Sequence, residues 1–214
     1  MKDPFWLVAA TCVLVGCAAS PPVHFYMLSD SPADTRRSDA GALSVRVQRV
    51  TIPPELERMQ LVRRLGPTQL KLLENEQWAA PLEDMIRRVL SADLAARLPV
   101  DSLQELGAPS VHDRQRALDV DIHEFYGDGN CAVTLRATWM LATPGLPRQA
   151  PDSRRTRATE EIRIPGDGCT DPAALPLAMS RALGVLSDHI AARAAAPGDP
   201  VSRPAPARSA QPGG

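Results

Sequence analysis

RALDVDIHEFYGDGNCAVTLRATWML, residues 116–141, is the stretch that decides the fold. In its first half Leu118, Val120 and Ile122 alternate with polar residues, which is the two-residue period of a half-buried strand. GDGN at 127–130 has turn chemistry, and a second strand-like run follows it at 131–141. The stretch therefore predicts two long consecutive strands.

Shorter strands are predicted on both sides of this stretch. The double proline at 53–54 ends one of them, and Gly66-Pro67 forms the turn of a predicted hairpin. The predicted strands cover residues 24–28, 43–50, 59–65, 68–74 and 156–164.

Two amphipathic helices are predicted, at 79–97 and 172–195. In the first, apolar residues recur every three or four positions and form one stripe: Leu82, Met85, Ile86, Val89, Leu90 and Leu94. Pro81 suits a first turn. Mixed strands with two helices that each need a sheet to cover predict an α/β layered sandwich around a mixed sheet.

The N-terminus carries an apolar run, FWLVAATCVLVG (5–16), that ends at a cysteine. Twelve residues make a helix of about 18 Å, which is too short for a hydrocarbon core of about 30 Å but typical of a secretory signal. LVGC at 14–17 resembles the lipobox of bacterial lipoproteins, in which the cysteine thiol takes a diacylglyceryl group and the small Gly16 admits the peptidase. We therefore expect cleavage between Gly16 and Cys17 and an N-acyl diacylglyceryl lipid on Cys17; the alternative is a cysteine buried at the end of a core helix. Ala18, rather than aspartate, predicts an outer-membrane anchor that faces the periplasm.

Cys131 and Cys169 remain in the mature chain. If 131–141 and 156–164 form a hairpin, its paired residue numbers sum to about 298, which brings these two cysteines close together just past its open end. A disulfide is therefore predicted for an oxidising compartment, with two free thiols as the alternative.

Composition limits the classes of partner. The 24 basic and 25 acidic residues nearly balance, and the arginine pairs at 36–37, 63–64, 87–88 and 154–155 are scattered. No basic field for nucleic acid or anionic lipid is expected, and these pairs are interpreted as solvated faces. The expected organisation is a signal peptide (1–16), a lipidated tether (17–23), one domain (24–196) and a disordered Pro/Ala-rich tail (197–214).

The candidate reactive cluster is Asp119, Asp121 and His123, which share one face of a strand. A solvent-facing strand explains them as well as a metal site does, and we favour that interpretation. Nucleophile-elbow, phosphate-loop and zinc-protease motifs are missing from the sequence. We therefore expect no enzyme, no metal and no cofactor other than the lipid on Cys17.

The layout resembles the ABC-type transport auxiliary lipoproteins, the paraquat-inducible protein C or YmbA-like family. The likeness covers about 24–195 and departs at Met59 and Gln60 and in the added tail. It is carried by the lipobox and by FYMLSDSP (25–32), IPPELERMQLVRRL (52–65), QWAAPLEDMIRRVLSADLAARLP (77–99), LDVDIHEFYGD (118–128) and LRATWML (135–141).

This resemblance implies a mixed five-stranded sheet layered by helices. It also implies a non-catalytic outer-membrane lipoprotein that partners a periplasmic MCE-domain protein of an ABC lipid transporter, and it makes a homo-oligomer plausible. The alternative function is a periplasmic carrier of lipid or another small ligand, with an apolar pocket.

Overall fold

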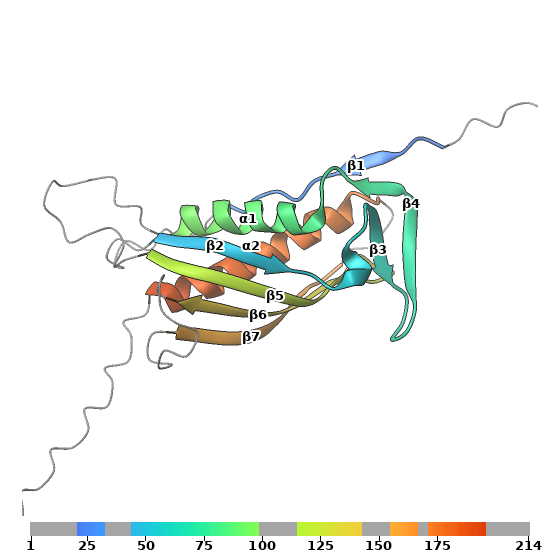
Figure 1. The fold of residues 1–214 in the computed structure, drawn as a ribbon. Coiled ribbons are helices and arrows are strands. Elements are labelled where there is room, and N and C mark those ends of the chain that lie inside the picture. The colour runs from blue at the N-terminus through green and yellow to red at the C-terminus, as the bar shows by residue number, and fades with distance from the viewer. Residues whose placement is uncertain (1–20, 33–43, 99–114, 143–154, 167–170, 196–214) are drawn as a thin grey trace, which may run out of the picture.

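The computed structural model describes residues 21–32, 44–98, 115–142, 155–166 and 171–195. Within these ranges seven strands form one sheet, and two helices pack on it (Figure 1). The α/β class, the mixed sheet and the two main helices are confirmed. The expected number of five strands is wrong, because the short first strand and the predicted hairpin join the same sheet.

Each element lies close to its predicted position. The helices are α1 (Leu82–Arg97) and α2 (Ala174–Ala195), and a 3₁₀ turn spans Pro54–Leu56. The strands are β1 (His24–Tyr26), β2 (Ser44–Thr51), β3 (Gln60–Arg64), β4 (Leu70–Trp78), β5 (Gln115–Gly127), β6 (Val133–Ala142) and β7 (Arg155–Ile164).

Strand β5 is the centre of the sheet. It pairs antiparallel with β6 from Ala117 to Gly127, and β6 pairs antiparallel with β7. On its other side β5 pairs parallel with β2, and at its end Gly127 lies opposite Arg63 of β3. Strands β3, β4 and β1 therefore continue the sheet beyond the end of β2, and we call these three strands the wing (Figure 1).

The core lies between the sheet and the two helices. Leu118, Val120 and Ile122 of β5 are buried as predicted, and the whole predicted stripe of α1 is buried. Trp139 of β6 is also fully buried. α1 begins at Leu82 and not at residue 79, because Pro81 occupies its N-cap position in an extended conformation.

Residues 28–32, which follow β1, cross the helix pair, and we call them the N-terminal strap. The Ser29 amide donates to Ser180 Oγ of α2 at 3.1 Å, and Arg88 of α1 donates to the Leu28 carbonyl at 3.0 Å. A Cβ added at Gly184 would lie 2.6 Å from the Ser31 Cβ, so the glycine gives the strap room to approach α2. The chain that leads from the N-terminus is thus fastened to both helices.

In the described part of the chain, neither helix is both long enough and apolar enough to cross a bilayer.

Candidate functional site

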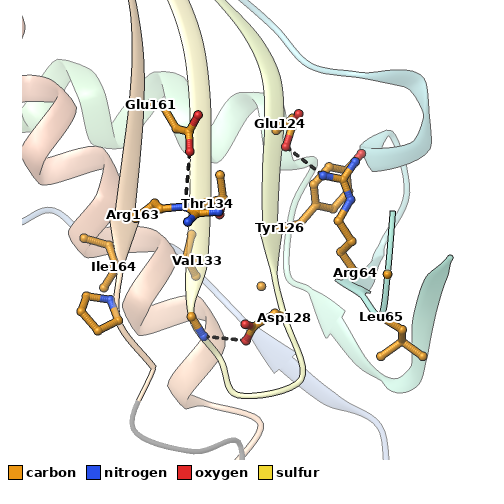
Figure 2. Close-up of a pocket in the computed structure, with 14 residues that line it drawn as sticks. Arg64, Leu65, Glu124, Tyr126, Asp128, Val133, Thr134, Glu161, Arg163 and Ile164 are labelled. Carbon is orange, nitrogen blue, oxygen red and sulfur yellow. Dashed lines mark hydrogen bonds and ion pairs between the residues drawn. The ribbon is translucent and has the colours of Figure 1, made fainter. Parts of the chain in front are cut away.

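The wing and the end of the main sheet enclose a cavity of about 670 Å³. The end of β3 and the turn after it form one wall, and the adjoining ends of β5, β6 and β7 form the other (Figure 2). Its lining combines charged and apolar side chains: Arg64, Leu65, Gly66, Glu124, Tyr126, Gly127, Asp128, Ala132, Val133, Thr134, Glu161, Arg163, Ile164 and Pro165.

Arg64 is the central cation of this cavity. Its Nη1 lies 2.9 Å from Glu124 Oε2, and its guanidinium carbon lies 5.0 Å from the centre of the Tyr126 ring (Figure 2). The second Glu124 oxygen pairs with Arg136 Nη2 at 2.6 Å. The arrangement holds β3 against β5 and β6 through paired charges, with a cation–π contact behind them.

The Tyr126 hydroxyl reaches out of the sheet to the 3₁₀ turn and donates to Glu55 Oε1 at 2.6 Å. This hydrogen bond lowers the pKa of Glu55. Burial, together with the neighbouring Glu55 carboxylate, raises the pKa of Tyr126. At neutral pH the pair is therefore a neutral phenol donating to a carboxylate.

Two acidic residues of the lining lie in ion pairs. Both oxygens of Glu124 pair with arginines, and the acidic Glu161 pairs with Arg163 at 3.3 Å. The charged lining also suits polar groups better than an acyl chain.

A second polar cluster lies under the N-terminal strap, between the helices. The Asp93 side chain is fully buried, and its Oδ1 accepts the Ser31 amide at 2.8 Å and lies 3.4 Å from Arg97 Nη1. Ser187 of α2 lies 3.4 Å from the second oxygen, and Arg97 also binds Asp188 at 2.7 Å. Burial raises the pKa of Asp93.

The predicted cluster of Asp119, Asp121 and His123 lies on the sheet face that the helices do not cover. Asp121 Oδ1 accepts from the Thr51 hydroxyl at 2.6 Å, and His123 Nε2 lies 2.9 Å from Thr138 Oγ1. Within the described ranges, His, Cys, Asp and Glu side chains form no group of three or more that could hold a metal ion. Cross-strand hydrogen bonding accounts for Asp121 and His123, which agrees with the solvent-facing interpretation.

The cysteine predictions are only partly visible. Cys131 is disulfide-bonded and has a positive φ of 58°. The numbers of paired β6 and β7 residues sum to 297, and Gly166 packs against the Cys131 backbone. Its predicted partner Cys169 lies outside the described residues, as do Gly16 and Cys17, so that pairing and the lipid attachment stay predictions.

The contacts of Arg64 and the cluster around Asp93 were not predicted from the sequence. The pairs Arg63-Arg64 and Arg87-Arg88 were expected to be solvated, yet Arg64 pairs with Glu124 and Arg88 donates to the strap. A usable signal existed for Asp93 alone: it lies four residues after Val89 and three after Leu90, which places it on the apolar stripe of the predicted helix.

Comparison with known proteins places this geometry in a family. The model of the ABC-type transport auxiliary lipoprotein component matches residues 26–191. The intermembrane transport lipoprotein PqiC of Escherichia coli (strain K12) is 28% identical over 145 residues, which are 65% of this chain and 75% of that protein. PqiC of Shigella flexneri is similar to the same extent.

Two solved structures share the fold. One is described only as an uncharacterized protein; it is 20% identical, its TM-score is 0.59, and the match covers 81% of this chain and 99% of the other. Protein XCC0632 from Xanthomonas campestris is 16% identical with a TM-score of 0.58, over 78% of this chain and 92% of its own. The family match extends from β1 to the last turns of α2, and thus over the strap, both helices and the cavity. The chain belongs to the family of ABC-type transport auxiliary lipoprotein components.

Proposed function

We propose that this chain is an outer-membrane lipoprotein that acts as a non-catalytic docking subunit of an MCE-type ABC lipid transport system. The acyl chains on Cys17 hold it to the leaflet, and the folded body faces the periplasm. The observation that carries the proposal is the family match over residues 26–191, which covers nearly the whole folded body. The name of the E. coli relative, an intermembrane transport lipoprotein, points to the same process.

The site chemistry supports an accessory role. Glu124 and Glu161 of the cavity lining lie in ion pairs, and Arg64 ties the wing to the sheet. A polar surface of this kind suits contact with a protein partner.

A periplasmic carrier is the second candidate, because a cavity of about 670 Å³ falls in the usual range for ligand sites. Its lining argues against a fatty ligand, since burying an acyl chain beside Glu124 and Arg163 would leave those charges poorly solvated.

Purification from detergent-solubilised envelopes distinguishes the two functions. The docking function predicts that the acylated chain brings down an MCE-domain protein and that organic extracts of the isolated chain hold no stoichiometric lipid. Bound lipid without any MCE partner would favour the carrier.

Two substitutions test the anchor. Cys17→Ser is expected to abolish acylation and release the mature body from the membrane, whereas Cys12→Ser, in the same apolar run, is expected to change neither. Ala18→Asp is expected to move the protein to the inner membrane in a density gradient, and Ala19→Asp serves as its control. Palmitate labelling of the Cys17→Ser protein would refute the attachment site.

A further inference from the structure

The exposed large apolar side chains of the described residues lie mainly on the wing. Six belong to β1, to the residues beside it and to the β3–β4 hairpin: Val23, Phe25, Met27, Leu65, Leu70 and Leu72. The other two, Met59 and Leu177, precede β3 and lie in the first turn of α2. Exposed apolar side chains gathered at one end of a molecule indicate an interaction surface.

The hairpin presents its apolar residues at its tip. The Leu65 amide donates to the Gln69 carbonyl at 2.9 Å and closes the turn. Leu65 is 50% exposed, and Leu70, on the other side of the turn, is 39% exposed. The tip, residues 65–72, projects away from both helices (Figure 1), and at its start Leu65 and Gly66 also line the cavity.

The half of the hairpin nearer its turn is basic, although the whole chain has a net charge of −1. Residues 60–73 carry Arg63, Arg64 and Lys71 and no acidic residue, whereas Glu74 and Glu76 lie in the half of β4 nearer β1. Arg64 is neutralised by Glu124, but Arg63 and Lys71 lie directly opposite each other on β3 and β4. Like charges in that register repel, and an anion bound beside them would relieve the repulsion. The structure thus gathers a local basic group that the scattered arginine pairs did not predict.

An apolar tip with basic residues behind it fits the surface of an anionic phospholipid leaflet. Leucines enter the boundary between headgroups and acyl chains, and each nearby Lys or Arg adds about 1 kcal/mol of attraction to anionic headgroups. A protein surface could match the leucines, but it would also need a cluster of carboxylates to match the charge.

The lipid anchor keeps this hairpin close to a leaflet. Five residues lie between Cys17 and Val23, and the six Cα–Cα steps limit that tether to about 20 Å. β1 pairs with β4 at Trp78, and the nine residues of β4 span about 30 Å from there to the tip. A body held on so short a tether meets the leaflet at a high effective concentration.

We propose that the hairpin tip is a second membrane contact, which docks on anionic phospholipid in the leaflet that holds the acyl chains of Cys17. This inference rests on the lipid anchor of the proposed function. An N-acyl diacylglyceryl group has three acyl chains and gives stable attachment by itself, so the tip would add a second point of contact and not the attachment. With the tip in the leaflet, the body would be oriented and not merely tethered.

Vesicle flotation of a lipid-free chain tests the tip separately from the anchor. A chain that begins at residue 17 and carries Cys17→Ser keeps every described element and the whole family match. At millimolar lipid it is expected to float with vesicles of phosphatidylglycerol and phosphatidylethanolamine, and not with vesicles of phosphatidylcholine alone. Added salt should weaken this binding, because the basic residues act through screened charge.

Two independent changes to the tip should each lower the partition coefficient at least about tenfold. One is the double variant Leu65→Ser and Leu70→Ser, and the other is Lys71→Glu. The matched controls, Leu177→Ser on α2 and Arg157→Glu on β7, should leave it unchanged. Circular dichroism checks that each variant is folded.

The inference is overturned if the tip variants float as well as the parent chain, or if the parent does not float at all. It is also overturned if the tip variants keep their affinity for vesicles but lose a protein partner in pull-downs, which would make the tip a protein-docking surface. Acylation in cells is scored separately with Cys17→Ser, so a failure of the anchor and a failure of the tip give different results.

Discussion

Replacing Asp93 with alanine is expected to loosen the N-terminal strap from the helix pair. The carboxylate is fully buried and accepts the Ser31 amide at 2.8 Å, with Ser187 and Arg97 each 3.4 Å away. Alanine removes all these contacts at once. It leaves the Ser31 amide without its acceptor and Arg97 with one carboxylate fewer.

The expected loss can be worked from these contacts. A hydrogen bond to a charged group contributes about 1.5–3 kcal/mol, and breaking a buried ion pair costs about 3–5 kcal/mol. Arg97 keeps Asp188 at 2.7 Å and the Ser31 carbonyl at 3.2 Å, so the lower end applies. We expect Asp93→Ala to lower the free energy of unfolding by about 3 kcal/mol, and the melting temperature by about 6–12 °C.

Asp93→Asn is the matched comparison. Burial raises the pKa of Asp93 because it penalises the charged form, so a neutral side chain that keeps the acceptor should cost only about 1 kcal/mol. Urea unfolding followed by circular dichroism measures both losses, and amide exchange at Ser31 reports the strap itself. A loss below about 1 kcal/mol for alanine, or equal losses for the two variants, would refute this account.

Three further outcomes are expected. Trp139→Ala should cost about 3–5 kcal/mol in urea unfolding, because the indole is fully buried and donates to Glu160 at 3.0 Å; a loss under 1 kcal/mol would contradict it. Tyr126→Phe should remove about 1 kcal/mol at neutral pH. The tyrosine hydroxyl lowers the pKa of Glu55, so their contact stabilises the folded state above the ordinary glutamate pKa. This contribution is lost as pH falls through the pKa of Glu55 in the folded state. The free energy of unfolding of Tyr126→Phe should therefore change less with pH in the acid range. Burial raises the pKa of Tyr26 to about 12, so stability should fall as pH rises from about 10 towards 12, and Tyr26→Phe should reduce that loss in melting curves taken across this range, with the part due to Tyr126 remaining.

Local pattern was enough to predict the two-layer body. The alternation at Leu118, Val120 and Ile122 and the stripe of α1 both require one buried face, and each face is buried as expected. Asp128 explains why the turn at 127–130 was recognisable: its carboxylate accepts the amides of Asn130 and Ala132. Such signals are readable because the residues that interact are close in sequence.

Features that depend on distant pairing were not predictable. β4 continues to Trp78, four residues beyond its expected end, because β1 pairs with it at residues 76–78. Nothing in ENEQW alternates, so tertiary pairing and not local preference makes that segment a strand. The contact of Arg64 with Glu124 likewise joins residues 60 positions apart. It forms because β5 pairs with β2 along most of its length but lies beside β3 at its end.

The route of the chain from β1 into the strap has a mechanical consequence. Tension applied at the N-terminus reaches β1 first and acts along that strand. It therefore loads the hydrogen bonds between β1 and β4 together, in shear, and does not break them one after another. Beyond β1 the load passes to the strap, where α2 holds Ser29 and α1 holds Leu28 and Ser31. Tension on the N-terminal segment is therefore shared between β4 and the helix layer, and the strap relieves the β1–β4 ladder of part of the load.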